Sequence, residues 1–377
     1  MGGGSSSEKG EAYKASDGKP KQIRTIPIFG VASSGKSTVF KGLKLARAGG
    51  LSEDERRYIG REMQFKCINS VASVLEKNLD TIGPAAEEFQ ELLVTGEKMR
   101  DEMSALLNVE EKTTKLMNLA KQAWDTIDVV KEQISSPSLW TNHFSLMHIF
   151  SKIDAICAFD YLATDTDALC VRVATYEQNQ LSYDVDGLQF NFRDFGGQRK
   201  LRGTWMKTAV EARAKKIHVP SLIFVLALDS FTQRTNAPED AILDESEPIM
   251  EYQGGGDEIN LNLMSETLCV LDLVAAQVFP NIPVVIYLNK IDLFAKALET
   301  ADLKQVFPTY EGGSDRVAAL AQIKQACLEK CGVNSGKRNE DGVTFIETNA
   351  TDLALMKRTM EAIHQVFNKT VMANAFQ

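Results

Sequence analysis

The sequence predicts an α/β protein in which a doubly wound sheet carries a phosphate-binding loop and is interrupted by an all-helical inserted domain. The apolar run Ile23–Phe29 passes directly into Gly30-Val31-Ala32-Ser33-Ser34-Gly35-Lys36-Ser37, which has the G-x-x-x-x-G-K-[ST] form of a phosphate loop. Beyond residue 180, short apolar runs alternate with helical patterns. Residues 52–161 show no convincing period-two alternation, so this long segment is predicted to be helical.

The first strand and the first helix flank the phosphate loop. We expect a helix from Lys36 to Arg47, because Gly49-Gly50 is a helix-stop signal. Pro27 fits poorly in a central strand, since proline cannot donate to the ladder. We therefore expect a bulge at Pro27.

The inserted segment reads as a series of amphipathic helices. Ser52 and Glu55 form a capping box, and Gly83-Pro84 ends the helix that starts there. Three apolar faces recur at helical spacing: Ile59, Met63, Cys67, Val71, Leu75 and Leu79; then Leu116, Ala120, Ala123, Ile127, Val130 and Ile134; then Phe144, Met147, Phe150 and Ile153. The predicted organisation is a flexible N-terminal extension (1–22), a discontinuous nucleotide-binding domain (23–48 and 172–377) and an inserted helical domain (49–171).

The strands after the insert are short. Leu181–Val185 and Leu188–Arg193 flank Asp186-Gly187, a dipeptide that favours a type I′ hairpin turn. Three apolar runs suit a buried parallel sheet, and one amphipathic helix closes the chain: Ser221–Leu228, Pro283–Leu288 and Val343–Ile346, then Met356, Met360, Ile363 and Phe367.

Composition disfavours two classes of function. The chain has 377 residues, 44% hydrophobic residues and a net charge of −9. This charge disfavours nucleic acid as a partner, because phosphate backbones bind basic surfaces. No apolar run reaches the roughly 18 residues of a membrane span. The six cysteines are scattered and no signal peptide is evident, which is typical of reduced thiols in the cytosol.

Four further motifs follow the phosphate loop in a fixed order: Arg172 with Thr175, Asp194-Phe195-Gly196-Gly197-Gln198, Asn289-Lys290-Ile291-Asp292, and Thr348-Asn349-Ala350. The loop offers backbone N–H groups at a helix N-terminus to a triphosphate, from Gly30 through Ser33, Ser34 and Gly35 to Thr38. Lys36 is expected to reach the β- and γ-phosphates, while Ser37 and Thr175 are expected to ligate Mg²⁺.

The third motif suits a sensor of the γ-phosphate. Asp194 can hold a magnesium-bound water at the end of a strand, and the N–H of Gly197 can meet the γ-phosphate. The segment after Gly197 would then be ordered with GTP and relaxed with GDP.

The last two motifs suit recognition of guanine. The Asp292 carboxylate can accept hydrogen bonds from guanine N1–H and the 2-amino group, a donor pair that adenine lacks. Asn289 and Lys290 would support the base from the side, and the N–H of Ala350 can reach its O6 atom.

Each motif alone has a plain structural explanation. The phosphate loop also occurs in ATPases, and strings such as Asp-x-x-Gly and Asn-Lys-x-Asp arise by chance in loops. Thr175 is equally suited to a strand, and Ala350 is only a small residue near a strand end. The ordered set, with its spacing, favours a GTP-operated switch.

From Ile23 to the C-terminus, the chain resembles the alpha subunits of heterotrimeric G proteins, in which a helical domain interrupts a Ras-like GTPase domain. The resemblance implies that Arg172, three residues before Thr175, is an arginine finger supplied in cis. It also implies that Gln198 orients the attacking water and that Leu169 contacts the nucleotide. Trp205 matches the second switch of the family, and Asn262-Leu263-Met264-Ser265-Glu266-Thr267 weakly resembles a motif of the third.

Several positions depart from the family pattern. Ala32 replaces a glycine, and its methyl group is expected to crowd the γ-phosphate and Gln198. Ser33 replaces a glutamate, so no carboxylate can pair with Arg172 across the nucleotide. We therefore expect slower hydrolysis and easier nucleotide exchange than the family norm. Tyr176-Glu177 replaces Thr-Gly on the surface where regulators of hydrolysis usually dock, so their use is left open.

The termini bear on location and partners. Met1-Gly2-Gly3-Gly4-Ser5-Ser6 fits N-myristoylation of Gly2, although a plain Gly/Ser tail is the alternative. A myristoyl group would place a cytoplasmic protein at the inner face of the plasma membrane. The resemblance implies a receptor and a beta-gamma dimer as partners. The short N-terminal region, with Gly10, Gly18 and Pro20, disfavours the beta-gamma contact, and the effector cannot be read from the sequence.

The segment 232–258 has eight acidic residues against Arg234, which favours a solvated loop over a docking site for a basic partner.

Three functional hypotheses remain. The first is a GTP-hydrolysing signal transducer with two states. The second is a hydrolysis-impaired binding module that is mostly loaded with GTP. The third is an ATPase of the same fold, against which Asp292 argues.

Overall fold

The computed structural model describes residues 23–47, 50–94, 109–136, 139, 143–171, 180–185, 188–197, 202, 205, 210, 217–236, 260–359, 361 and 363. The chain divides into two compact units. The first consists of Met1–Phe40, Glu177–Asn349 and Arg358–Gln377, and the second of Lys41–Tyr176 and Ala350–Lys357. Each unit has its own apolar core. The predicted fold class is confirmed.

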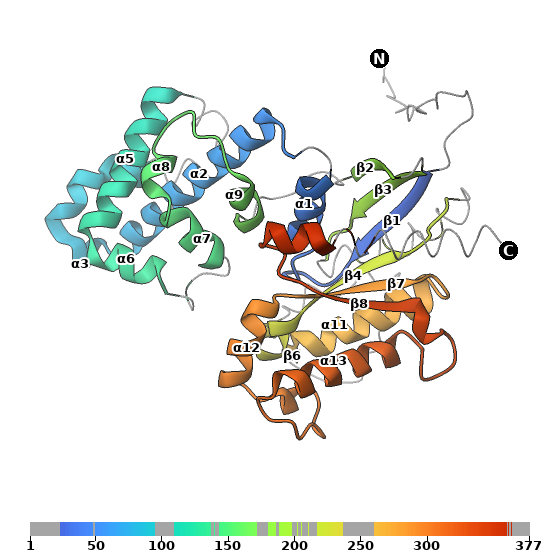
Figure 1. The fold of residues 1–377 in the computed structure, drawn as a ribbon. Coiled ribbons are helices and arrows are strands. Elements are labelled where there is room, and N and C mark those ends of the chain that lie inside the picture. Colours follow the sequence, from blue (N-terminus) through green and yellow to red (C-terminus); the bar gives the residue numbers. More distant parts are fainter. Residues whose placement is uncertain are drawn as a thin grey trace, which may run out of the picture. The chain divides into compact units, whose positions relative to one another are not determined.

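A six-stranded sheet forms the centre of the first unit, in the order β2-β3-β1-β4-β7-β8 (Figure 1). Only β2 is antiparallel to its neighbour, and all other neighbours are parallel. The strands are β1 (Ile23–Phe29), β2 (Gln180–Val185), β3 (Leu188–Asp194), β4 (Leu222–Ala227), β7 (Val284–Asn289) and β8 (Val343–Glu347). Every residue of β4 and β7 is buried, as expected for the middle of a parallel sheet.

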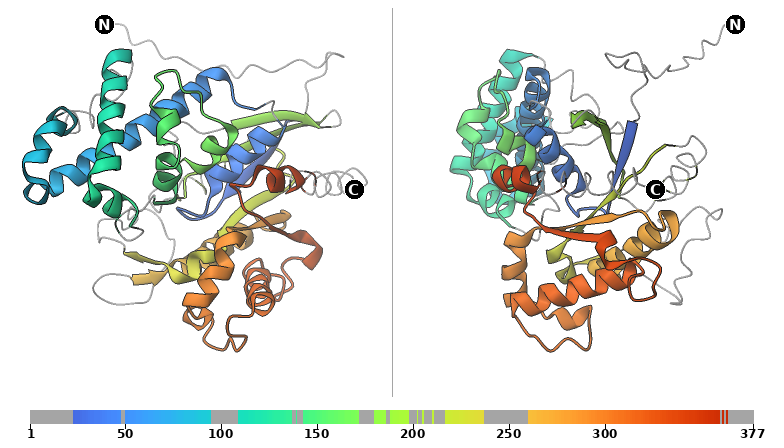
Figure 2. Two further views of the ribbon diagram at one scale, coloured as in Figure 1. Left: turned by 60° about the vertical axis from the view of Figure 1, so that its left-hand side comes forward. Right: turned by 45° about the vertical axis from the view of Figure 1, so that its right-hand side comes forward.

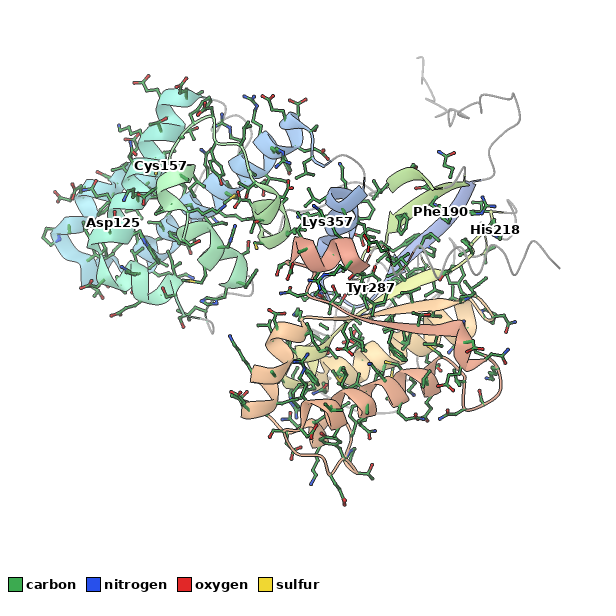
Figure 3. The ribbon with its side chains drawn as sticks, viewed as in Figure 1. Asp125, Cys157, Phe190, His218, Tyr287 and Lys357 are labelled. Atoms are coloured by element: carbon green, nitrogen blue, oxygen red, sulfur yellow. The ribbon has the colours of Figure 1, made fainter. Side chains whose placement is uncertain are left out.

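The bulge that we expected at Pro27 is absent on the β3 side of β1, but the pairing on the other side of β1 is irregular there. The β1–β3 register runs without interruption from Ile23 to Ile28, and Pro27 pairs with Arg193. Thr25 N–H donates 2.9 Å to the carbonyl of His218, on the opposite side of β1, and Figure 3 labels His218 there. Because N–H groups alternate along a strand, the nitrogen of Pro27 faces the same side as that of Thr25. On that side Arg24 bridges His218 and Ile28 pairs with Ile223, so four steps along β1 face five steps along the neighbouring segment, and the pairing is interrupted where Pro27 lies.

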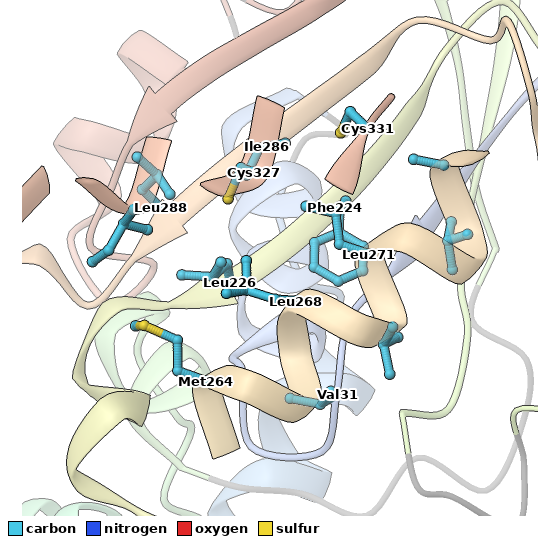
Figure 4. Close-up of a cluster of buried hydrophobic side chains, with 14 of the residues drawn as sticks. Val31, Phe224, Leu226, Met264, Leu268, Leu271, Ile286, Leu288, Cys327 and Cys331 are labelled. Atoms are coloured by element: carbon cyan, nitrogen blue, oxygen red, sulfur yellow. The ribbon is translucent and has the colours of Figure 1, made fainter. Parts of the chain in front are cut away.

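Helices pack on the sheet of the first unit through a shared apolar core. In Figure 4, Leu268 and Leu271 of α11 (Leu263–Asp272) lie over Phe224 and Leu226 of β4. The helix α11 continues into the π-helix η5 (Leu273–Val278). The same core includes Cys327 of α13 (Arg316–Lys330). The other elements are α12 (Ile291–Thr300), η3 (Leu228–Thr232), η6 (Leu303–Gln305), η7 (Glu340–Gly342), and the antiparallel pair β5 (Arg234–Asn236) and β6 (Asn260–Asn262). The acidic segment between β5 and β6, from 237 to 259, lies outside the described residues.

The described part of the second unit is helical (Figures 1 and 2). Its longest helix, α2 (Glu53–Lys77), starts at the predicted capping box: Glu55 N–H donates 3.2 Å to Ser52 Oγ, and Ser52 N–H donates 2.9 Å to Glu55 Oε2. The predicted apolar face of α2 is buried from Ile59 to Leu75. The other helices are α3 (Leu79–Ile82), η1 (Gly83–Phe89), α5 (Glu110–Thr126), α6 (Asp128–Ile134), α7 (His143–Phe150), α8 (Ile153–Ile156) and α9 (Asp165–Cys170). Helix α1 (Lys36–Arg47) crosses the division between the units after Phe40.

All three predicted helical faces differ in detail. The first helix ends at Lys77 and not at Gly83-Pro84, because Asn78 leaves the helical conformation, and Leu79 is 43% exposed in the separate helix α3. The face from Leu116 to Ile134 belongs to two helices, because the backbone of Ile127 is extended between α5 and α6. Phe144 is 56% exposed, since the buried positions of α7 are Ser145, Leu146, Ile149 and Phe150. Helix continues over 353–359, where Met356 is buried, while Met360 and Phe367 lie outside the described residues.

Among the residues that the structure describes, none of the helices has both the length and the apolar character needed to cross a membrane.

Candidate functional site

The phosphate loop joins the end of β1 to the start of α1. Its backbone is left-handed at Gly30 (φ 146°), Ser33 (φ 62°) and Gly35 (φ 94°). A Cβ atom at Gly30 would collide with the carbonyl of Val225, and one at Gly35 with the Asn289 side chain. Only glycine suits these two positions, so the loop can lie close against its neighbours and turn N–H groups toward an anion.

Donors line the loop on its buried side. The Lys36 side chain is 6% exposed, and its Nζ atom donates 2.7 Å to the carbonyl of Val31. Ser34 is 1% exposed, and its Oγ atom has no hydrogen-bond partner among the described residues. A buried hydroxyl without a partner is unfavourable unless a ligand satisfies it, so this loop fits a phosphate group. Ser33 is exposed, whereas Thr38 is half-buried in the first turn of α1.

Two residues from distant parts of the chain form the metal side of the candidate site. The parallel register pairs Ile28 of β1 with Asp194 of β3, so both strands end at the same edge of the sheet. There the Ser37 hydroxyl donates 2.9 Å to Asp194 Oδ2. A hydroxyl beside a carboxylate is the all-oxygen set that Mg²⁺ prefers, so these residues fit that ion.

Gly197 lies against the phosphate loop. A Cβ atom there would collide with the Lys36 ammonium group and the carbonyl of Gly30. Upstream, Phe195 N–H donates 3.2 Å to the carbonyl of Ile28, and the Phe195 ring stacks on Phe29 with 5.1 Å between ring centroids. The segment that follows β3 is therefore fixed to β1 and to the phosphate loop.

Arg202, which the sequence did not single out, holds the residues after β3 together with Glu266 and Trp205. The Arg202 guanidinium donates 3.4 Å to the carbonyl of Gly197 and 2.6 Å to Glu266 Oε1 on α11. Both side chains are buried, at 9% and 4% exposure. Trp205, which is fully buried, donates from Nε1 to the carbonyl of Gly196 at 3.2 Å. Glu266 belongs to the motif 262–267, but its partner could not be read from a single sequence.

The base side of the candidate site lies where β7 and β8 end. Asn289 is 2% exposed, and its Nδ2 atom donates 2.9 Å to the carbonyl of Ser34 in the phosphate loop. Thr348 N–H donates 3.0 Å to the carbonyl of Leu288, and Ile291 N–H donates 3.3 Å to the carbonyl of Thr348. These bonds join the Asn289–Asp292 turn to the loop after β8, and the carboxylate-bearing Asp292 is exposed.

Lys290 has a partner that the sequence did not reveal. Its Nζ atom lies 3.1 Å from Asp229 Oδ2, and Asp229 is 8% exposed in η3, after β4. The register pairs Ala227 with Asn289, so the two residues follow neighbouring strand ends.

The helical unit fixes the chain just before Arg172. Asp167, which is fully buried, accepts from His148 at 2.7 Å, from Lys152 at 2.7 Å and from Tyr161 at 2.6 Å. These donors hold the pKa of Asp167 below its usual range, against the effect of burial, and the carboxylate in turn raises the pKa of His148 to about 9. Lys41 Nζ donates to the carbonyls of Ala168 and Val171, both at 3.1 Å.

The remaining predicted site residues are not brought together by the described structure. Leu169 is 3% exposed in α9, and Ala350 is 2% exposed; both belong to the second unit. Arg172, Thr175 and Gln198 lie outside the described residues, as does Gly2.

The chain is similar to known proteins along most of its length. A family model described as "G-protein alpha subunit" matches residues 5–367. A guanine nucleotide-binding protein subunit alpha of Emericella nidulans is 26% identical over 340 residues, which is 90% of this chain and 86% of the relative. The guanine nucleotide-binding protein alpha-2 subunit of Dictyostelium discoideum is 25% identical over 371 residues, or 94% and 91% of the two chains. A guanine nucleotide-binding protein subunit alpha of Cochliobolus heterostrophus is 26% identical over 377 residues, with 97% of each chain covered.

Proposed function

The chain belongs to the family of G-protein alpha subunits, and on this premise we propose how its residues bind the nucleotide, sense the γ-phosphate and hydrolyse GTP. It is a guanine nucleotide-binding protein that hydrolyses GTP and transduces signals, as members of this family do. Family membership decides against the ATPase hypothesis.

We propose that Ser37 and Thr175 ligate Mg²⁺ and that Asp194 holds a water bound to the ion. The 2.9 Å hydrogen bond between Ser37 Oγ and Asp194 Oδ2 carries this proposal, because it joins a helix N-terminus and a strand end at one point. When bound, the ion would neutralise negative charge between the β- and γ-phosphates. Lys36 and the buried Ser34 hydroxyl would supply the neighbouring phosphate contacts.

The γ-phosphate would be sensed through Gly197. Its N–H would donate to the phosphate, while its carbonyl accepts from Arg202. Arg202 pairs in turn with Glu266, so a change at Gly197 is transmitted to α11. GTP and GDP would therefore favour different arrangements of the segment after Gly197, which is what a switch requires.

Arg172 would act as an arginine finger and Gln198 would orient the attacking water. The bonds from Lys41 to the carbonyls of Ala168 and Val171 support the first role, since they fix the backbone next to Arg172. Ala32 and Ser33 would make hydrolysis slower and exchange easier than in most of the family.

We also propose the domain limits predicted above: 1–22, 23–48 with 172–377, and 49–171.

Asp292 would select guanine, with Asn289 and Lys290 beside the base and the N–H of Ala350 toward O6. The bond from Asn289 to the carbonyl of Ser34 supports this arrangement, because it joins the base side to the phosphate loop. Leu169, together with the loop residues Gly30, Ser33, Gly35 and Thr38, would complete the nucleotide contacts.

Receptors and beta-gamma dimers are the general partner classes of this family. We propose that Gly2 carries a myristoyl group and that the protein is cytoplasmic and peripheral on the inner face of the plasma membrane. One acyl chain binds a membrane only weakly, so a second attachment would be needed for stable anchoring. The N-terminal sequence disfavours a tight beta-gamma contact.

Competition binding tests the base site directly. Wild-type protein is expected to prefer GTP over ATP and XTP. Asp292→Asn replaces an acceptor by an amide, which can donate to the 2-oxo group of xanthine, so it should shift the preference toward XTP. An unchanged preference for GTP in Asp292→Asn would reject the proposed role of Asp292.

A further inference from the structure

A partly buried ion pair connects two neighbouring strand ends on the base side of the candidate site. Asp229 lies in η3, directly after β4, and Lys290 directly follows β7. Lys290 Nζ lies 3.1 Å from Asp229 Oδ2, and the side chains are 26% and 12% exposed. The carboxylate of this pair is thus better shielded from water than that of the surface pair between Lys324 and Glu347, in which Glu347 is 40% exposed.

Asp229 is itself held in place. Gln233 Nε2 donates 3.1 Å to Asp229 Oδ2, and the Thr232 hydroxyl donates 2.9 Å to the Asp229 carbonyl. The second carboxylate oxygen, Oδ1, is buried and has no hydrogen-bond partner among the described residues. Burying a carboxylate that is only partly satisfied is unfavourable for folding, so stability alone gives little reason for an acid here.

Lys290 occupies a constrained backbone position. Its backbone is left-handed (φ 62°, ψ 40°) at the N-terminus of α12. It lies between Asn289, which donates to the phosphate loop, and the first turn of α12, which carries Asp292. A lysine side chain is long and flexible, and its ammonium group must be anchored if its methylene stem is to form a fixed surface.

We propose that Asp229 is a positioning residue for guanine nucleotide binding. Its carboxylate anchors the Lys290 ammonium before the nucleotide arrives, so that the methylene stem of Lys290 is pre-arranged as one wall of the base site. This inference rests on the proposed role of the Asn289–Asp292 motif. The base is common to GDP and GTP, so the loss of Asp229 affects retention of both nucleotides equally.

Release of a fluorescent guanine nucleotide provides the test. Asp229→Asn keeps the shape of the side chain but removes its charge, and is expected to speed release of GDP and of a non-hydrolysable GTP analogue several-fold, by the same factor. Lys290→Met should have a similar effect. In the double variant, release should be no faster than in Lys290→Met alone, because both substitutions remove the same interaction.

Two comparisons separate positioning from a merely structural role. The rate constant for hydrolysis of GTP already bound should fall much less than the release rate rises. Lys290→Arg, which keeps the cation, should retain most of the slow release. Lys324→Met, which removes the exposed pair between Lys324 and Glu347 (2.9 Å), is the matched control and should leave release unchanged.

Three results would overturn the inference: unchanged release in Asp229→Asn while Lys290→Met is fast, additive effects in the double variant, or equal losses of hydrolysis and retention. Failure of the base site itself would be recognised separately. In that case Asp292→Asn would leave the preference for guanine intact.

Discussion

The Ser37 hydroxyl donates a 2.9 Å hydrogen bond to Asp194 Oδ2, although 157 positions separate the two residues in the sequence. The whole second unit is inserted between them, apart from residues 350–357. The bond exists because β1 and β3 are parallel neighbours whose carboxyl ends meet at one edge of the sheet. The site proposed for Mg²⁺ thus depends on the sheet register and not on closeness in the sequence.

Removing the Ser37 hydroxyl tests this site. In the wild type, Mg²⁺ is expected to slow release of bound GTP analogue, and chelation should speed it. Ser37→Ala should release nucleotide quickly whether or not Mg²⁺ is present, because one of the proposed ligands is lost. Thr300→Ala, which removes an exposed hydroxyl bonded only within α12, should behave as the wild type. A normal Mg²⁺ response in Ser37→Ala would show that this hydroxyl is not a ligand.

The buried pair of Arg202 and Glu266 should contribute strongly to stability. Glu266→Ala removes the carboxylate that pairs with the buried Arg202 guanidinium, a loss that typically costs about 3 kcal/mol. The loss is measured as the decrease in the free energy of unfolding in urea, with the same nucleotide bound to each variant. The matched control is Glu347→Ala, because Glu347 and Lys324 are 40% and 32% exposed, and there the loss should stay below about 1 kcal/mol. Equal losses of unfolding free energy in Glu266→Ala and Glu347→Ala would contradict the prediction that the buried pair stabilises the protein more than the exposed pair.

The pair of His148 and Asp167 predicts a dependence of stability on pH. The pKa of His148 is raised from 6.5 to about 9, chiefly by its hydrogen bonds to Asp167 and Cys170. A raised pKa means that the folded protein binds the proton more tightly, so the stabilisation is complete below pH 6.5 and is lost as the pH rises through about 9.

Thermal unfolding of the full chain can measure this effect. Between pH 6.5 and pH 9, the wild type should lose stability relative to His148→Gln, which cannot titrate. Tyr161 also donates to Asp167, and it does not ionise in this range because burial and the Asp167 carboxylate raise its pKa. A constant difference between the two proteins would exclude His148 as the source.

Ala32 is expected to limit the rate of hydrolysis. It is half-buried in the phosphate loop, next to the left-handed Ser33. Ala32→Gly removes the methyl group that we expect to crowd the γ-phosphate, so single-turnover hydrolysis should become several-fold faster. Ala297→Gly, a substitution of the same kind within α12, should not change the rate. If Ala32→Gly also leaves it unchanged, the steric explanation for slow hydrolysis is wrong.

Local sequence signals determined part of this structure well. The limits of β1 and α1, and the start of α2, follow from the phosphate loop, the Gly49-Gly50 stop and the capping box at Ser52 and Glu55. All of these are interactions between residues a few positions apart. Pro27 shows the limit of such rules, since its effect depends on which side of the strand its nitrogen faces.

The charged partners inside the first unit could not be predicted. Arg202 meets Glu266 across 64 positions, and Asp229 meets Lys290 across 61, so the sheet and helix packing decides each pair. Phe144 is a smaller example. Its helix exists as predicted, but the rotation of that helix is set by its neighbours, and the ring is exposed.

Single-turnover hydrolysis of preloaded GTP, in the wild type and in Arg172→Ala and Gln198→Leu, tests the central proposal most directly. An arginine finger is worth about 10³-fold or more, so Arg172→Ala should slow hydrolysis by at least that factor. Gln198→Leu should also abolish most of the activity, because the attacking water would no longer be oriented. If instead the wild type hydrolyses GTP slowly and neither substitution changes that rate, Arg172 and Gln198 do not contribute to catalysis. The chain would then be the hydrolysis-impaired binding module that is mostly loaded with GTP.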